Sequence, residues 1–287
     1  MTGETYPNIE ELHTLKNITN ADEIAFYGGT FTGLPQKFMI ELLSVHPNIP
    51  KRISTRPDCI DESIITILKE WNVKTIELGI ESLDNEVLSA SNRGYTSETV
   101  FNAIELIKPH FEIIAHLMVG LPKDSKEKDI ATVKDLIKLG IKEYRIHPTL
   151  VFKNTKLEEM YKNNQYVPLS IDEALDIVSD MVILIEGNGG KVLRMAYHVP
   201  QSQLQFVVAG PYHPSFGDMV RAHIIRKIIN KLEIKKVKYP KKFASWFNSY
   251  GNTQLNVIKE ETDNTNCEII FDNLLYNKAL QLYMMNS

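Results

Sequence analysis

Apolar residues recur with two alternating periods along the first two thirds of the chain. Runs in which apolar and polar residues alternate predict strands at Glu23–Tyr27, Arg52–Thr55, Thr75–Gly79, Glu112–Val119, Lys142–His147 and Lys191–Tyr197. Apolar residues at three- and four-residue steps predict helices between them, at Pro35–Val45, Ile60–Trp71, Ser97–Lys108, Lys126–Leu139 and Ser170–Glu186. Strands that alternate with helices of this length indicate right-handed βαβ units, and therefore a parallel α/β sheet or barrel.

The pattern loosens beyond Val199 into sequence punctuated by glycine and proline. We expect a basic helix there, followed by an aromatic, polar tail. The prediction is a barrel core over residues 1–165 and a small α/β C-terminal extension over residues 166–287, with a soft boundary between 165 and 200.

Side chains alternate across a strand, so each predicted strand has two faces. One face is apolar, as in Ile76, Leu78 and Ile80, and the helices should bury it. The other face is polar on most strands and carries Tyr27, Ser54, Arg56, Glu77, Glu81, His116, Met118, Arg145 and His147. Since burying an unpaired charge costs several kcal/mol, this set favours a barrel whose interior opens onto a bound polar ligand. For each residue singly, a satisfied polar group in the core is the competing interpretation.

Composition narrows the class of protein further. The 287 residues are 43% hydrophobic and 24% charged, as in ordinary globular proteins, and no apolar run is long enough to span a membrane. The polar, acidic N-terminus does not have the pattern of a signal peptide. The two cysteines, Cys59 and Cys267, exclude a disulfide framework, a four-cysteine zinc site and a cysteine-held cluster, and they indicate a cytoplasmic protein.

The net charge of −4 is unevenly spread. The segment Arg226–Lys242 holds eight lysines and arginines against one glutamate, and Phe243, Trp246, Phe247 and Tyr250 follow it. Cations beside aromatic rings are typical of surfaces that bind single-stranded RNA. The alternative is a solvated helix that packs on its apolar side.

Ligands of parallel α/β folds bind at the carboxyl ends of the strands. Those ends read FYGGTFTGL, STRPDC, ELGIESLD, MVGLPKDS and HPTLVFKNTKL in this sequence. Gly28 and Gly29 have no side chain to keep a ligand from the backbone, and Thr30 adds a hydroxyl group. Asp124 and Ser125 follow Gly-Leu-Pro in a turn that leads into a helix, where free amides could receive an anion.

Longer segments around these loops carry a family resemblance. YGGTFTGLP, STRPDCID, ELGIESLDNEVLSASNRGYT, HLMVGLPKDS and RIHPTLVFKNTKLEEMY, in this order across residues 23–161, resemble the radical S-adenosylmethionine enzymes. The similarity is to the branch of the elongator catalytic subunit and of oxygen-independent coproporphyrinogen oxidase. HPSFGDMVR, at 213–221, resembles the tail of bacterial relatives that lack an acetyltransferase.

The resemblance implies a (β/α)6 three-quarter barrel, like a partial TIM barrel, that binds S-adenosylmethionine at its open end. It implies that Gly28, Gly29 and Thr30 receive the methionyl amino group and that Arg93 pairs with the methionyl carboxylate. Ser54 and Glu81 match contacts to the ribose or the carboxylate, and many relatives carry Gln in place of Glu81. His116 matches a position in the adenosyl pocket that is often Asp in the porphyrinogen relatives.

The sequence departs from the family at its cluster motif. Members hold three irons of a 4Fe-4S cluster with C-x3-C-x2-C after the first strand, and reductive cleavage of S-adenosylmethionine then gives a 5′-deoxyadenosyl radical. This chain has no such motif. We therefore expect a truncated radical enzyme in which the first strand is missing, one that is inactive alone and has no assigned catalytic residue or metal ligand. The cluster would be present only with a complementing N-terminal segment.

Two other interpretations remain open at this point. The chain could be a non-catalytic barrel remnant that binds a nucleotide or RNA. It could also be a phosphate-binding (β/α) enzyme that uses Glu77 or Glu81 as its acid/base group. The resemblance does not choose between a transfer RNA, which Arg226–Lys242 could bind, and a tetrapyrrole as the substrate.

Overall fold

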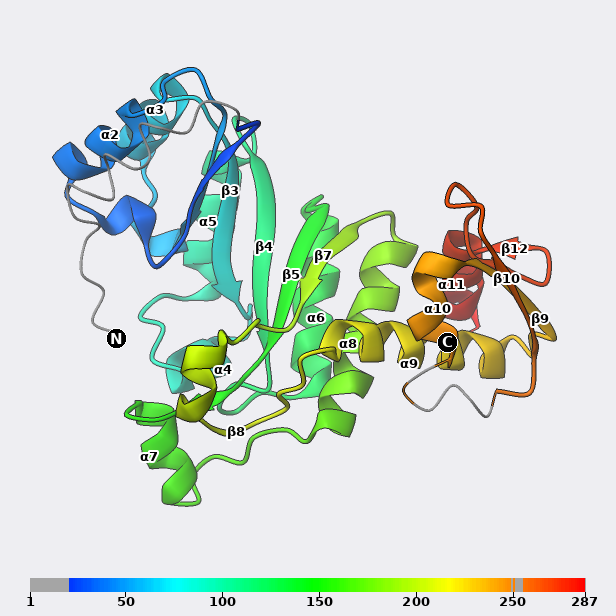
Figure 1. Cartoon of the computed structure of the whole chain (residues 1–287). Helices are drawn as coiled ribbons and strands as arrows, with labels where there is room; N and C mark the ends of the chain where they lie inside the picture. The colour runs from blue at the N-terminus through cyan, green and yellow to red at the C-terminus, as the bar shows by residue number, and fades with distance from the viewer. Residues whose placement is uncertain (1–20, 249, 251–254, 287) are drawn as a thin grey trace. The chain divides into compact units, whose positions relative to one another are not determined.

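All six predicted strands lie in one sheet. The computed structural model describes residues 21–248, 250 and 255–286. Its main sheet is a parallel half barrel with the strand order β1-β2-β3-β4-β5-β7 (Figure 1). The strands span Ile24–Phe26 (β1), Lys51–Thr55 (β2), Val73–Glu81 (β3), Glu112–Val119 (β4), Glu143–Pro148 (β5) and Lys191–Met195 (β7). The predicted α/β class is therefore confirmed.

The chain divides into two compact units, Met1–Leu117 (unit 1) and Met118–Ser287 (unit 2), and the division falls inside β4. Unit 1 contains two short 3-10 helices, η1 (Phe31–Gly33) and η2 (Pro57–Cys59). Its α-helices are α2 (Gln36–Ser44), α3 (Glu62–Glu70), α4 (Asn85–Ala90) and α5 (Ser97–Ile107). The predicted division at residue 165 concerns the end of the barrel core and stays a prediction.

Side-chain caps fix where the helices of unit 1 begin. Asp61 accepts a hydrogen bond from the amide of Ile64 (2.9 Å) at the start of α3, and Asp84 accepts one from Val87 (3.0 Å) at the start of α4. Each carboxylate satisfies an amide that has no partner within its helix. These caps place both helices directly after the carboxyl ends of β2 and β3, the ends at which the candidate site lies.

Both faces of β3 in unit 1 are largely buried. Ile76, Leu78 and Ile80 of β3 are fully buried, so the apolar face is placed as predicted. Glu77 lies on the opposite face and is only 4% exposed. The polar face of β3 is thus covered as well, which places a carboxylate in the interior.

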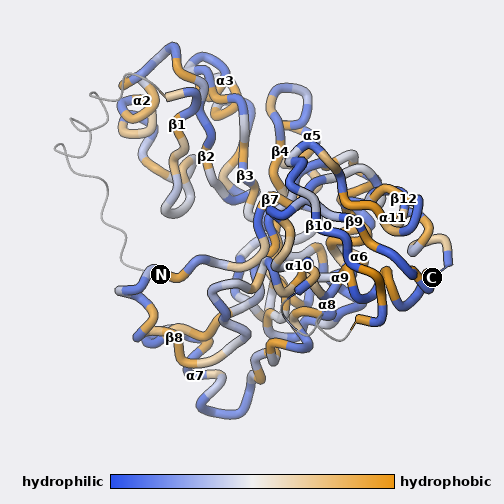
Figure 2. The backbone as a smooth tube through the Cα atoms, turned by 45° about the vertical axis from the view of Figure 1, so that its right-hand side comes forward, coloured by the Kyte–Doolittle hydropathy of each residue, from blue (hydrophilic) through white to orange (hydrophobic). Residues whose placement is uncertain are grey.

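Unit 2 continues the alternation of strands and helices. Its helices here are α6 (Lys126–Lys138), α7 (Lys156–Lys162), α8 (Ile171–Gly187), α9 (Phe216–Lys231) and the 3-10 helix η3 (Gln201–Phe206). Strands β6 (Val151–Phe152) and β8 (Val207–Ala209) pair antiparallel. Hydropathy alternates along the tube in Figure 2, as expected where helices bury one face. None of the described helices is long and apolar enough to cross a membrane.

A small mixed sheet forms the C-terminal part of unit 2. Its strands are β9 (Lys236–Pro240), β10 (Ile258–Thr262), β11 (Ile270–Phe271) and β12 (Leu274–Leu275), in the order β10-β9-β11-β12. The 3-10 helix η4 (Lys241–Phe243) and the helices α10 (Ala244–Asn248) and α11 (Tyr276–Met285) accompany it. The segment Arg226–Lys242 is therefore not one basic helix, because α9 ends at Lys231 and residues 236–240 form a strand.

Candidate functional site

The glycine loop after β1 exposes its backbone. Gly28 and Gly29 have φ angles of 115° and 140°, in the region that side chains rarely adopt. A Cβ on Gly28 would meet no atom within 4 Å. The next turn is tied to β2, since the hydroxyls of Thr32 and Thr55 lie 2.5 Å apart. The loop therefore presents open backbone from a fixed base, and half-buried Thr30 lies at its end.

Glu81 is the centre of the polar cluster at the end of β3. Its φ is 63°, in the left-handed region, and the pairing register between β3 and β4 shifts between Gly79 and Glu81. Oε1 of Glu81 lies 2.9 Å from Nη2 of Arg93, and Oε2 lies 3.1 Å from Nδ1 of His116. With its side chain 7% exposed, Glu81 is a buried carboxylate held between two basic groups.

Arg93 is held in turn by a tyrosine. Its Nε donates to the hydroxyl of Tyr95 (3.1 Å), and that hydroxyl donates to the carbonyl of Gly79 (2.6 Å). Burial raises the pKa of Tyr95 to about 12, so its hydroxyl keeps its proton. Among the described residues, Nη1 of Arg93 has no hydrogen-bond partner. The guanidinium is therefore fixed in place with one edge still able to bind an anion.

Arg56 fixes the same loop from β2. Its guanidinium makes a two-point pair with Asp58 (2.9 and 2.7 Å), and its Nη2 donates to the carbonyl of Arg93 (2.7 Å). Arg56 and Arg93 each lie 5.4 Å from the centre of the Tyr95 ring. The chain segment of Arg93 is thus positioned by β2 as well as by β3.

His116 is charged more readily in this cluster than in water. Burial lowers its pKa, but the charge of Glu81 and the hydrogen bond to it outweigh burial, so the pKa of His116 lies above its usual value. The charge of buried Glu77 also raises the pKa of His116, so two carboxylates face the two basic groups of this cluster. What the cluster offers an anionic ligand group is the unbonded edge of Arg93.

All seven candidate residues from the sequence lie in unit 1. Glu81, Arg93 and His116 are in direct contact, whereas Ser54 lies half-buried on β2, in register with Glu77 of β3. Gly28, Gly29 and Thr30 form the separate loop after β1. Sequence reasoning missed Tyr95 as a site residue. It lies two positions after Arg93 in the NRGYT segment, but nothing in that segment shows that its hydroxyl reaches back to β3.

The loop after β4 does not offer free amides. In unit 2, Oδ2 of Asp124 accepts from the amides of Gly120 (3.0 Å) and Leu121 (3.3 Å), and its Oδ1 accepts from Ser125 (2.8 Å). The prediction placed an external anion at the first amides of the helix that follows, and there the amide of Lys128 donates to Oγ of Ser125 (3.4 Å). Side chains of this turn therefore already engage the amides of Gly120, Leu121, Ser125 and Lys128.

The cysteines do not form a metal site. Cys59 lies in η2 and Cys267 in unit 2, and both are free thiols. Burial raises the pKa of Cys59, which disfavours the thiolate that binds metal. Among the described residues, no three His, Cys, Asp or Glu side chains are grouped so that they could hold a metal ion. The residues of this chain therefore do not fit a 4Fe-4S cluster.

Comparisons with known proteins agree with the geometry of the fold. A model of the radical SAM superfamily matches residues 8–137, and a model of the radical SAM C-terminal domain matches residues 141–226. An uncharacterized protein of Methanocaldococcus jannaschii is 33% identical over 168 residues, which cover 55% of this chain and 52% of that protein. A tRNA uridine(34) acetyltransferase of the same organism is 28% identical and covers 61% of this chain and 38% of its own length.

A solved structure extends the similarity of fold. The Methanocaldococcus infernus Elp3 with an N-terminal deletion aligns with a TM-score of 0.65 and 24% identity, over 76% of this chain and 57% of that one. The chain spans about half, or less, of the length of the curated relatives that it matches.

Proposed function

Since the chain belongs to the radical SAM superfamily, in its Elp3-like branch, we propose that unit 1 binds S-adenosylmethionine and that the protein acts on transfer RNA. The observation that carries the first part is the buried cluster of Glu81, Arg93 and His116 at the ends of β3 and β4. A relative is named as a tRNA uridine(34) acetyltransferase, which supports the second part. A cytoplasmic location belongs to the same proposal, supported by two free thiols.

Each predicted residue has a role in this proposal. The open backbone of Gly28 and Gly29, with the hydroxyl of Thr30, receives the methionyl amino group. The free edge of Arg93 pairs with the methionyl carboxylate. Ser54 and Glu81 hydrogen-bond the ribose or the carboxylate, and His116 borders the adenosyl group. Because Glu81 already neutralises part of Arg93, we expect this site to bind the carboxylate less tightly than a site with glutamine would.

Isothermal titration of the whole chain with S-adenosylmethionine tests the binding proposal. The Arg93→Gln variant should lose at least roughly tenfold in affinity, as expected for the loss of a charge-assisted pair. Lys74→Gln is the matched control, because Lys74 is an exposed cation at the opposite end of β3 from Glu81. No binding to the native chain, or equal affinity in both variants with unchanged circular dichroism, would refute the site.

Radical chemistry needs more than this chain holds. Beside a reduced four-iron cluster, S-adenosylmethionine supplies a carbon radical in this superfamily. The two cysteines cannot provide the three thiolates of that cluster. We therefore propose radical activity only together with a complementing segment that carries C-x3-C-x2-C. The cysteine count also favours a second candidate, a non-catalytic barrel that binds a nucleotide or RNA.

Transfer RNA binding through Arg226–Lys242 is the less supported part of the proposal. Lys227 is paired with Asp176 and Asp180, and Lys236 and Lys238 are paired with Glu260. Phe247 is fully buried and stacks on Tyr239 at 4.1 Å. Exposed Lys231 lies over the ring of Tyr283 (4.2 Å), and the other exposed cations outside these pairs are Lys235, Lys241 and Lys242. If they contact phosphates, the affinity for transfer RNA should fall with rising salt, with a log–log slope of about −2 to −3. An affinity that does not change with salt concentration would show that this segment is not the binding surface for transfer RNA.

A further inference from the structure

Unit 2 contains a pocket that the proposed S-adenosylmethionine site does not use. It lies where the loop after β7 meets the start of α9, and its volume is about 360 Å³. The lining comes from two stretches, residues 194–198 and 212–218. A volume of this size accommodates a small ligand of about one nucleotide.

The lining of this pocket favours an anion. Arg194 is exposed and, among the described residues, forms no ion pair. Nδ1 of His213 accepts the amide hydrogen of Ser215 at 3.0 Å, so the neutral ring carries its proton on Nε2 and can donate it. Asp218 is the one carboxylate in the lining, and it accepts the indole N–H of Trp246 (3.1 Å). Three basic side chains, Arg194, His198 and His213, thus line the pocket, while its one acid already has a hydrogen-bond partner.

The start of α9 adds to this positive potential. The helix has 16 residues, and the pocket lining includes Phe216, Gly217 and Asp218 of its first turn. Gly217 has no side chain to keep a ligand from the helix amides, and a Cβ there would meet nothing nearer than 3.7 Å. Amides at a helix N-terminus attract anions such as phosphate.

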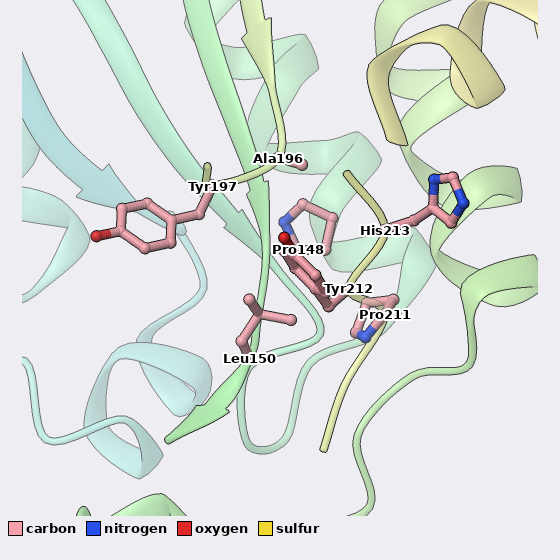
Figure 3. A pocket seen from close by; sticks show the side chains of 7 residues that line it. All are labelled: Pro148, Leu150, Ala196, Tyr197, Pro211, Tyr212 and His213. Carbon is pink, nitrogen blue, oxygen red and sulfur yellow. The ribbon is translucent and has the colours of Figure 1, made fainter. Parts of the chain in front are cut away.

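An exposed aromatic ring borders the same pocket. Tyr197 is 42% exposed although it makes edge-to-face contacts with His147 (6.2 Å) and Phe152 (6.4 Å). Figure 3 shows a smaller neighbouring pocket that shares Tyr197 and His213 with this one, and the ring of Tyr197 points away from the other labelled side chains there. The preceding residue, Ala196, has a φ of 76°, an uncommon conformation for alanine that sets the direction of the loop. Tyr197 is therefore a held ring that still has exposed surface, as in platforms on which bases stack.

We propose that this pocket binds one nucleotide of an RNA ligand. Arg194, His213 and the amides of Gly217 and Asp218 hold its phosphate, since the Phe216 amide donates to the carbonyl of His213 (3.1 Å), and Tyr197 stacks on its base. This inference rests on the proposed action on RNA, but its site lies in unit 2 and is separate from the residues that we assign to S-adenosylmethionine.

The test uses the whole chain and three probes: uridine 5′-monophosphate, uridine and inorganic phosphate, each titrated and followed by NMR. The monophosphate should bind more tightly than either part alone. Arg194→Gln should lower the affinity for the monophosphate by roughly tenfold or more and leave the affinity for uridine unchanged. Tyr197→Ala should weaken both the monophosphate and uridine, whereas Tyr197→Phe keeps the ring and should keep the affinity.

Lys191→Gln is the matched control, since Lys191 is an exposed cation at the opposite end of β7. If Arg194→Gln and Lys191→Gln change the affinity for the monophosphate equally, the proposed binding site is wrong. It is also wrong if the native chain does not bind the monophosphate at millimolar concentration. If the monophosphate binds with the expected variant pattern but S-adenosylmethionine does not bind, the pocket stands and the proposed function of unit 1 fails. The proposal is also overturned if uridine and its monophosphate bind the Tyr197→Ala variant as tightly as they bind the native chain.

Discussion

Glu81 holds an unfavourable backbone conformation inside a network of favourable charges. A non-glycine residue in the left-handed region costs on the order of 1 kcal/mol or more, and its φ is 63°. The ion pairs to Arg93 and His116 offset that cost only while both partners are charged. The site therefore couples backbone strain to the protonation of one histidine.

Changing Glu81 to glutamine should release that histidine. In Glu81→Gln the burial of His116 remains, but the charge of Glu81 is gone and only the smaller effect of Glu77 is left, so the pKa of His116 should fall. In the native chain the folded pKa is raised, so this pair stabilises the fold fully below the unfolded pKa and loses its effect as pH rises through the folded pKa. The variant should lose more stability near pH 6 than near pH 9. Titration of the His116 ring by NMR measures the shift, and an unchanged pKa would contradict the pairing.

Neighbouring residues of β3 should respond very differently to substitution. Leu78→Asp places an unpaired charge where the native side chain is fully buried, and it should unfold unit 1. Glu77→Leu replaces a buried carboxylate with an apolar group of similar size, and the fold should survive with a change of at most about 2 kcal/mol. Chemical denaturation followed by circular dichroism compares the two. Equal loss of folding in both variants would show that the two faces of β3 are wrongly assigned.

At the scale of single elements, α6 begins with a pair of acids. Burial, followed by the charge of Asp124, raises the pKa of Asp129 to about 9, so Asp129 is protonated at neutral pH and shares a hydrogen bond with Asp124. Asp129 is 3% exposed, and its Oδ2 is buried without a hydrogen-bond partner among the described residues. The folded state therefore keeps a proton that the unfolded chain releases near pH 4.

Replacing this acid with an amide should stabilise the protein. Stability should fall in the native chain as pH rises from about 4 to 9, because the unfolded state binds fewer protons over that range. Asp129→Asn keeps a hydrogen-bond donor toward Asp124 and cannot ionise. The variant should gain on the order of 2 kcal/mol at pH 8 and little at pH 4. Urea denaturation at both pH values tests this prediction. Asp135→Asn is the control, because Asp135 forms an exposed ion pair with Lys138 on the same helix. An equal gain in the free energy of unfolding at both pH values would contradict the protonation of Asp129 in the folded state.

The elements that periodicity predicts well are those with one dominant face. The helix from Ser170 was predicted from its capping box and its apolar steps, and Ser170 and Glu173 do form that box. β9 was missed because its lysines dominate the reading, although Val237 and Tyr239 alternate with them and are buried. Tyr95 could not be predicted because its partner, the carbonyl of Gly79, is a backbone group 16 residues away. Local patterns show a period, but they do not show which distant backbone atom a side chain reaches.

At the scale of the whole molecule, the chain has the fold of the family but not the three cysteines that the family's cofactor chemistry requires. Unit 1 retains the residues expected to hold S-adenosylmethionine, while the chain has two cysteines. A site-differentiated four-iron cluster needs three thiolates on one loop. Cys59 lies in η2 with a raised pKa, and Cys267 belongs to unit 2. The proposed binding of S-adenosylmethionine therefore does not depend on the thiolates that the redox step needs.

That separation gives a direct biochemical prediction. Reconstituted anaerobically with iron and sulfide, the whole chain should show no cluster absorbance and no reductive cleavage of S-adenosylmethionine. Its affinity for S-adenosylmethionine should be the same with and without iron, because no open iron is present to chelate the amine and carboxylate. The double variant Cys59→Ser, Cys267→Ser should retain any residual iron to the same extent as the native chain, since neither thiol is part of a cluster site. Addition of a segment with C-x3-C-x2-C should give both cluster absorbance and cleavage, because it supplies the three thiolates that the two cysteines of this chain cannot provide. Cluster formation by the chain alone, lost in the double variant, would mean that its two cysteines recruit ligands of a kind that the superfamily does not use, and the assignment of Arg93 as the carboxylate partner would then have to be reconsidered.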